Sequence, residues 1–505
     1  MEASWVGAQL RLREQMDQWW GRGVNDYGER AWGGGHDHGT FAASWIEHLR
    51  LTGNAQLRDF ITRLRASCLQ WAPGAFTHGY WPRQEAHHGP EHFIIFLARL
   101  WRMNPTDAEI AAALDDAAEH IGNWAHGVPH WYDYNRSRFI SWSLGTEVVG
   151  EDSRFAYQSP EHFKVLQMAL VAYQATGNRR YLDLPCEYAD VWAGHILEGA
   201  IPAVLFPLND PEQIARRYGE RLNGERRLPR VDALERHVAA WGIDTFLDLF
   251  ELVGEMRYLD VVRIMLEGLV RHAGDPYADP VAPLFSRYRR LSGDGGFDAE
   301  LLLAIAAPHA EDDVARSNVM AFDDGPAPHP MGLGRRRDAP LWGYRDGDGQ
   351  LFEETGPSPA ALMLRYELTG EEAAAARAFE LAAARMRLAL GAGLGHGWNH
   401  GCAGNTVSAV AFGHGRMPGA GVVMATLYPA TVGASRFCST ERHWLSYELD
   451  DGSVGLPEDC AALLRVELTG DASLLLANTS DSRIGLQIRP GGPEVKLRAP
   501  GVNGE

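Results

Sequence analysis

Cysteine is scarce in this chain, and long apolar runs are absent from it. The five cysteines, Cys68, Cys186, Cys402, Cys438 and Cys460, are odd in number and include no Cys-x-x-Cys pair. This pattern argues against a disulfide framework and a cysteine zinc site, so we expect a reducing compartment. No uncharged apolar stretch of about 18 residues occurs, which argues against a membrane span.

The chain also lacks an excess of basic residues and a secretory leader pattern. Its 47 lysines and arginines face 66 aspartates and glutamates, giving a formal net charge of −19. Such a charge makes a nucleic acid a poor candidate partner, and basic groups such as Arg287, Arg289 and Arg290 are interpreted as solvated faces. Residues 1–20 are amphipathic and mixed in charge, so we expect a cytoplasmic location unless a secretion signal was removed.

The most distinctive feature that is present is a five-residue segment that occurs twice. It reads GPEHF at 89–93 and SPEHF at 159–163, and each copy opens an apolar run. Proline fits the first turn of a helix, where its missing N–H has no intrahelical partner. Each Glu-His pair is therefore predicted to lie at the N-terminus of a helix.

Helix-forming segments follow one another in pairs. The pairs are predicted at 41–71, 91–121, 161–196, 237–270, 298–320 and from 358 onward. Within a pair the link is short and contains glycine or asparagine, which fit helix ends. Asn54 is predicted to start a helix, and Gly177 and Gly254 mark the breaks within their pairs. Between pairs the links are long, at about 72–90, 122–160, 198–236, 273–297 and 321–357. This alternation predicts a ring of paired helices whose long connections gather on one rim.

The C-terminal part has a different composition. Glycine is dense from about residue 391, and short alternating apolar runs follow after about residue 440. Such runs between turn residues are typical of β-strands. The fold is therefore predicted as mainly α, with a ring of six helical hairpins over residues 1–390. A Gly-rich connection and a C-terminal antiparallel β-sandwich are predicted over residues 391–505.

This layout resembles the (α/α)-toroid carbohydrate enzymes, which are polysaccharide lyases and glycosidases with an (α/α)6 barrel that a β-sandwich often follows. The resemblance covers most of the chain and lies in the order of the hairpins rather than in a family signature. It implies a glycan or oligosaccharide substrate, bound at the rim where the inner helices begin.

Clusters of aromatic and polar residues precede the predicted inner helices, and a further cluster lies late in the chain. Flat rings that stack on sugar faces, interleaved with groups that bind hydroxyls, suit a carbohydrate site. The substrate-binding candidates are His36, His38, Trp81, His88, Trp131, Arg138, Trp142, Trp398 and Asn399.

Two reactions are weighed for this rim. Elimination from a uronic acid needs a base, often Tyr or His, and groups that neutralise the sugar carboxylate. The catalytic candidates are His162, Tyr134, His92, Tyr132, Asn135, Arg136, His400 and Glu161. We expect His162 or Tyr134 as the base, with Asn135, Arg136 and His400 on the carboxylate. The density of these residue types favours a lyase.

Other interpretations stay open. Hydrolysis would instead need two carboxylates, from among Asp37, Glu91, Asp133, Glu147, Glu161 and Glu353. A sugar epimerase or isomerase and a glycan-binding toroid without catalysis are further alternatives. The Glu-His pairs could also serve only to cap and pack helices. No metal site is assigned, although His36, His38 and other rim histidines could hold a divalent metal.

Overall fold

The computed structural model describes residues 4–27, 42, 45–46, 48–83, 86, 93–150, 155–202, 204–205, 233–274, 281–306, 320–322, 342–345, 351–353, 357–391, 435–436, 443–468, 471–491 and 496–497. Within these residues helices predominate and the strands form small sheets. This confirms the mainly α class predicted from the sequence. None of the described helices combines the length and the apolarity that crossing a membrane requires.

The helices follow one another along most of the chain. They are α1 (Ser4–Tyr27), α3 (Ala55–Ala75), η1 (Phe93–Leu97), α4 (Ala98–Met103), α5 (Ala108–Ile121), α6 (His162–Thr176), α7 (Arg180–Leu197), α9 (Ala233–Ala239), α10 (Gly242–Val253), α11 (Met256–Glu267), η3 (Val270–His272), α12 (Ala282–Ser292), α13 (Gly295–Ala306), α16 (Pro359–Thr369) and α17 (Glu372–Gly391). Residues 48–52 are also helical and precede α3.

Local sequence sets the ends of several helices. The Asn54 side chain accepts hydrogen bonds from two backbone N–H groups in the first turn of α3, as its predicted capping role requires. Gly177 and Gly254 follow α6 and α10 with φ of 72° and 75°, a conformation that costs glycine little. The second copy of the repeated segment starts α6, with Glu161 as the N-cap residue.

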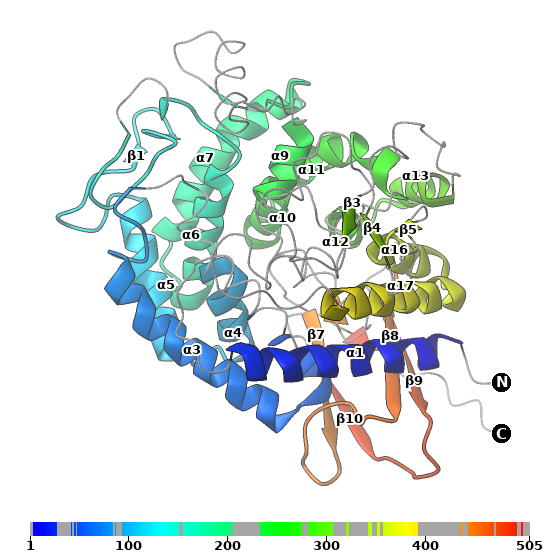
Figure 1. Cartoon of the computed structure of the whole chain (residues 1–505). Helices are drawn as coiled ribbons and strands as arrows, with labels where there is room; N and C mark the ends of the chain where they lie inside the picture. The colour runs from blue at the N-terminus through cyan, green and yellow to red at the C-terminus, as the bar shows by residue number, and fades with distance from the viewer. Residues whose placement is uncertain are drawn as a thin grey trace.

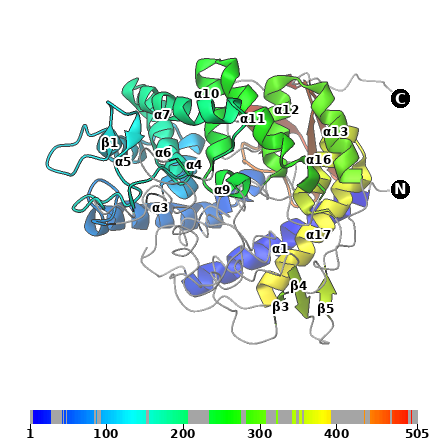
Figure 2. The ribbon, with the colours of Figure 1, turned by 90° about the horizontal axis from the view of Figure 1, so that it is seen from above.

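Consecutive helices pack in pairs that form two rows. The inner row consists of η1–α4, α6, α10, α12 and α16, and each of its members contacts the next one in chain order. The outer row consists of α5, α7, α11, α13 and α17, each packed on the inner-row helix that precedes it. The two rows stand around a common centre, and α1 lies along α17, so the first and last described helices meet (Figures 1 and 2).

One inner-row helix occupies a segment that the sequence predicts to be a connection. The connection was expected at 273–297, but α12 lies within it and pairs with α13. The second half of the hairpin predicted from residue 298 lies outside the described residues. The expected first helix of that hairpin is instead the outer member of the pair. Arginines in α12 suggested a solvated segment, yet Arg287 and Arg289 are buried in ion pairs with acidic side chains of neighbouring helices. The interpretation of these arginines as a solvated face is therefore also wrong.

The strands form small separate sheets. They are β1 (Tyr132–Asp133), β2 (Arg138–Phe139), β3 (Met320–Phe322), β4 (Trp342–Arg345), β5 (Leu351–Glu353), β6 (Ser435–Arg436), β7 (His443–Leu449), β8 (Cys460–Val466), β9 (Asp471–Asn478), β10 (Leu486–Gly491) and β11 (Lys496–Leu497). The sheet orders are β1-β2, β3-β4-β5, β10-β7-β6 and β11-β9-β8. Most pairs are antiparallel, whereas β3 with β4 and β11 with β9 are parallel. The parallel β11–β9 pair differs from the antiparallel arrangement expected at the C-terminus.

The C-terminal strands pack on helix α1. The side-chain amide of Gln9 pairs with the backbone of Ala462 in edge strand β8, at 2.6 Å to its oxygen and 2.8 Å to its nitrogen. The guanidinium of Arg13 donates to the carbonyl oxygen of Leu456 at 2.9 Å and to that of Cys460. One hydrophobic core runs from α1 through the inner row to β8. Polar side chains on α1 therefore satisfy strand backbone groups that would otherwise be buried without partners.

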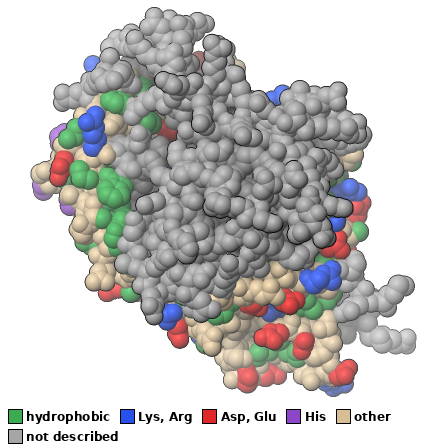
Figure 3. All heavy atoms as spheres, in the orientation of Figure 1, with side chains coloured by type: hydrophobic (Ala, Val, Ile, Leu, Met, Phe, Trp, Pro, Cys, Tyr) green, Lys and Arg blue, Asp and Glu red, His purple; other side chains and the backbone are tan. Residues whose placement is uncertain are grey.

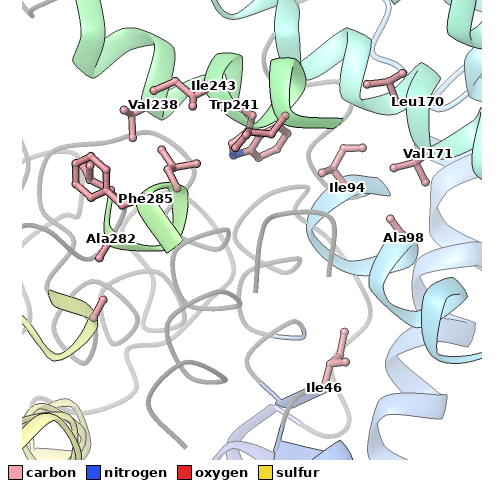
Figure 4. Packing of buried hydrophobic residues seen from close by; sticks show 14 of the residues in the cluster. Ile46, Ile94, Ala98, Leu170, Val171, Val238, Trp241, Ile243, Ala282 and Phe285 are labelled. Carbon is pink, nitrogen blue, oxygen red and sulfur yellow. The ribbon is translucent and has the colours of Figure 1, made fainter. Parts of the chain in front are cut away.

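Apolar side chains face the centre around which the inner row stands. Figure 4 shows Ile94 and Ala98 of η1 and α4 on one side, with Trp241 of the α10 N-terminus and Phe285 of α12 on the other. All four belong to the continuous core. Along the described margin of the face in Figure 3, acidic and basic side chains are interspersed.

Candidate functional site at the start of helix α6

Side chains fix the segment that connects α5 to α6. Asn123 accepts hydrogen bonds from the backbone N–H groups of Trp131 (2.7 Å) and Tyr132 (3.0 Å), and donates to the Tyr132 carbonyl (2.6 Å). Gln158 pairs in the same manner with the backbone of Phe139, at 3.0 and 2.8 Å. These amides act as strand partners for the β1–β2 hairpin. The segment that leads into α6 is therefore held in a defined conformation.

Glu161 lies at the N-cap of α6 and is partly exposed. Its Oε2 atom accepts hydrogen bonds from the indole N–H of Trp142 and from the hydroxyl of Ser159, the latter at 3.3 Å. The Trp142 ring is nearly parallel to those of Phe155 and Tyr157, with centroids 6.3 and 5.7 Å away. An oriented carboxylate thus stands beside stacked aromatic rings at the start of an inner-row helix.

His162, the next residue, is completely buried. Its Nδ1 atom accepts from the backbone N–H of Ser159 and the hydroxyl of Tyr188, both at 3.1 Å, and its Nε2 atom is 3.1 Å from the Ser141 carbonyl. A backbone N–H can only donate, so the ring proton is on Nε2. Burial lowers the pKa of His162 to about 4, and the ring is neutral at pH 7. This geometry speaks against the base role predicted for His162.

The two tyrosines of the hairpin are poorly suited to act as bases. Tyr132 is buried and donates to Glu187 at 3.3 Å, whereas Tyr134 is 46% exposed and donates to the Gly122 carbonyl at 2.9 Å. Desolvation raises the pKa of Tyr134 to about 12, and desolvation together with Glu187 raises that of Tyr132 further. Both hydroxyls therefore stay protonated at neutral pH, and a base must be deprotonated.

The described part of the predicted carboxylate clamp, Asn135 and Arg136, lies at the tip of the β1–β2 hairpin, whereas its third member, His400, lies outside the described residues. Asn135 and Arg136 are exposed, and their contacts are with Asp133, which accepts from the Asn135 backbone at 3.1 Å and from the Arg136 guanidinium at 3.3 Å. Arg138 lies partly buried in β2. Figure 1 places β1 at the outer margin of the molecule. The structure therefore does not bring this clamp to the centre that the inner row surrounds.

The tryptophans predicted as sugar platforms pack within the protein. Trp131 is 1% exposed, donates from its indole nitrogen to the Gly145 carbonyl at 3.0 Å, and meets Tyr80 and His120 edge to face. Trp142 is 2% exposed. Trp81 is partly exposed and meets Phe76 and Trp71 edge to face. A ring whose faces are covered cannot stack on a sugar, so burial speaks against this role for Trp131 and Trp142.

The other predicted site residues lie outside the described residues. They are His36, His38, His88, His92, Trp398, Asn399 and His400. Their roles in binding or catalysis stay predictions, as does a metal site built from histidines 36 and 38. Among the residues that the structure describes, no group of three or more His, Cys, Asp or Glu side chains is arranged to hold a metal ion.

Three inner-row helices are joined by a buried polar network that was not predicted from the sequence. Gln167 of α6 donates to Asp248 of α10 at 2.7 Å and to Thr245 at 3.1 Å. Arg287 of α12 pairs with Asp248 and with Glu251. Arg287 and Asp248 are 2% and 0% exposed, and such buried charges are tolerated only when they are paired. The network therefore sets how these helices pack on one another.

A helical spacing could have revealed this network. Asp244, Asp248 and Glu251 are separated by four and three residues, so they share one face of α10. Acidic residues on the face of a helix that is otherwise apolar indicate buried partners rather than solvent. An arginine was therefore to be expected on a neighbouring helix.

No protein-family model matches this chain, and neither a curated protein nor a solved structure matches it significantly. The candidate site therefore rests on the geometry of this chain alone.

Proposed function

We propose that this chain is a carbohydrate-active enzyme built as an (α/α)6 toroid, with Glu161 as an acid–base group. The described helix pairs support this architecture, because the inner-row helices contact one another in chain order and α1 packs along α17. Residues 48–52 with α3 would form the first hairpin of the toroid. The C-terminal strands would correspond to the β-sandwich that follows the helices.

The observation that carries the proposal is the setting of the Glu161 carboxylate. An indole N–H and a hydroxyl orient it, and the ring that donates the N–H stacks on a second aromatic ring. General acid–base catalysis requires an ionisable group that is held in place and partly open to a substrate. Glu161 is partly exposed, whereas its neighbours Trp142 and His162 are buried.

Glycoside hydrolysis agrees better with the described residues than β-elimination does. Hydrolysis uses two carboxylates across a sugar, and Glu161 would supply the acid–base group. The second carboxylate would come from Asp37 or Glu91, which the sequence places ahead of inner helices.

β-Elimination from a uronic-acid-containing glycan is the second candidate. The hydroxyls of Tyr132 and Tyr134 are protonated, and both ring nitrogens of His162 are in hydrogen bonds. This reaction would therefore need His92 or His400 as its base. His92 directly precedes η1, and η1 packs on α6. This adjacency supports the lyase as the second candidate.

Product analysis with a panel of neutral and uronic-acid-containing oligosaccharides tests the proposal. Hydrolysis releases saturated reducing sugar, whereas β-elimination releases an unsaturated uronate that absorbs in the ultraviolet. We expect saturated product, and a fall in kcat of about 10²-fold or more for Glu161→Gln. Glu198→Gln, which changes an exposed glutamate at the end of α7, is the matched control. Turnover that survives intact in Glu161→Gln, or the absence of both product types across the panel, would refute the proposal.

A further inference from the structure

The His162 ring forms a hydrogen bond with the backbone of Ser141, which directly precedes Trp142, a residue that contacts Glu161. Its Nε2–H donates to the carbonyl of Ser141 at 3.1 Å, and the next residue, Trp142, donates from its indole nitrogen to the Glu161 carboxylate. The backbone N–H of Trp142 is held by the Phe155 carbonyl at 2.8 Å. The imidazole therefore helps to fix the segment from which the indole reaches the carboxylate.

The same ring also forms a hydrogen bond with Ser159, the second residue that contacts Glu161. The backbone N–H of Ser159 donates to His162 Nδ1 at 3.1 Å. The hydroxyl of Ser159 lies 3.3 Å from Glu161 Oε2 and accepts the Glu161 backbone N–H at 3.2 Å. Both groups that donate to the carboxylate are therefore attached to segments that His162 joins.

The ring has little freedom to turn away from these partners. It is completely buried and stacks on Phe139, with centroids 4.7 Å apart and an interplanar angle of 13°. The Tyr188 hydroxyl shares Nδ1 with Ser159. Rotation of the imidazole would break these hydrogen bonds together and leave their buried partners unsatisfied, because the ring is completely buried.

From this arrangement we infer that His162 is a positioning residue for Glu161. The inference deepens the proposed function and rests on it, since it assigns His162 a role in orienting the Glu161 that precedes it. His162 touches no substrate. It holds Ser141 and Ser159 at a fixed separation, so that the indole and the hydroxyl meet the same carboxylate oxygen.

Two substitutions separate the two hydrogen bonds of the ring. In His162→Gln the amide nitrogen reaches the place of Nε2 and keeps the bond to the Ser141 carbonyl. In His162→Asn the amide oxygen reaches the place of Nδ1 and keeps the bond from Ser159. We therefore expect the Trp142–Glu161 contact to persist in the Gln variant and to be lost in the Asn variant.

Nitrogen NMR of the tryptophan side chains reports this contact without any substrate. The protein is labelled with 15N-tryptophan, and Trp142→Phe assigns the indole signal of Trp142. Glu161→Gln shows where that signal moves when the carboxylate is lost. His162→Asn should move the signal in the same direction, and His162→Gln should leave it near its wild-type position.

His237→Gln is the matched control. His237 is also completely buried, but its Nε2 atom lies 3.2 Å from the Pro202 carbonyl, in neither segment that reaches Glu161. This variant should lower stability while leaving the Trp142 signal unchanged. Movement of the signal in both His162→Asn and His237→Gln would mean general loosening, and would overturn the inference.

Kinetics with the substrate found in the glycan panel give a second measurement. In His162→Gln the Ser159 contact weakens, and loss of a donor raises the pKa of a carboxylate. The alkaline limb of the kcat profile, which reports the proton-donating carboxyl group, should therefore move to higher pH, with a fall in kcat of about 10- to 100-fold and little change in KM. An unchanged alkaline limb would overturn the inference even if His162→Asn does not fold. Full turnover in Glu161→Gln would instead overturn the proposed function, while the NMR comparison would still decide the positioning role.

Discussion

Acid should destabilise this fold well before its carboxylates become protonated. His162 and His237 are completely buried, and desolvation lowers the pKa of each from 6.5 to about 4. His120 is also buried, and its pKa is lowered to about 3, mainly by desolvation and further by His78. Each ring is therefore neutral in the folded protein over a pH range in which it is charged in the unfolded chain.

The sign and the size of the effect follow from proton linkage. Between pH 6.5 and the folded-state pKa values the unfolded chain binds more protons, so the free energy of unfolding falls as the pH falls. At about pH 5 each histidine lowers that free energy by about 2 kcal/mol relative to about pH 8. Three such groups give a loss of about 6 kcal/mol, which is a large part of the 5–15 kcal/mol that typically separates folded from unfolded protein.

Urea unfolding followed by circular dichroism over this pH range measures the effect. The free energy of unfolding should fall steadily from about pH 6.5 downward. Its steepest slope against pH should correspond to about three protons taken up on unfolding. In His237→Gln about one third of this slope should disappear. A free energy that varies by less than about 1 kcal/mol between pH 8 and pH 5 would refute the reasoning.

Other contacts give further predictions. Arg287→Met removes the guanidinium that pairs with the buried Asp248 carboxylate and should lower the free energy of unfolding by about 3–5 kcal/mol, and a second change, Asp248→Leu, should recover part of this loss in urea unfolding. Arg13→Met removes donors to carbonyls near β8 and should cost about 1–3 kcal/mol, with faster proteolysis between β7 and β8. Asn123→Ala removes its bonds to the β1–β2 hairpin and should speed proteolysis there, with a similar cost, while the rate at Arg58, in α3, stays unchanged.

Much of the helical framework could be predicted from the sequence, because the hydrogen bonds that cap a helix join residues only a few positions apart. Asn54 could be identified as an N-cap, and Gly177 and Gly254 as helix ends, because a cap depends on the backbone of its own turn. The place of Glu161 at the start of α6 followed in the same way. The C-terminal strands were visible in their alternation, and α17 ends at Gly391, where the Gly-rich composition begins.

The role of each polar side chain was decided only by tertiary structure. The sequence of α12 is the same whether Arg287 meets water or Asp248, and only the position of α10 makes it a buried ion pair. Likewise His162 was predicted as a base because imidazole suits that chemistry, yet Ser141 and Tyr188, distant in sequence, occupy its nitrogens and exclude water. Desolvation and hydrogen-bond saturation arise from segments that are far apart in the chain. The sequence alone therefore located the Glu-His pair on its helix, and the packing around it determined that Glu161 is partly exposed and His162 is buried.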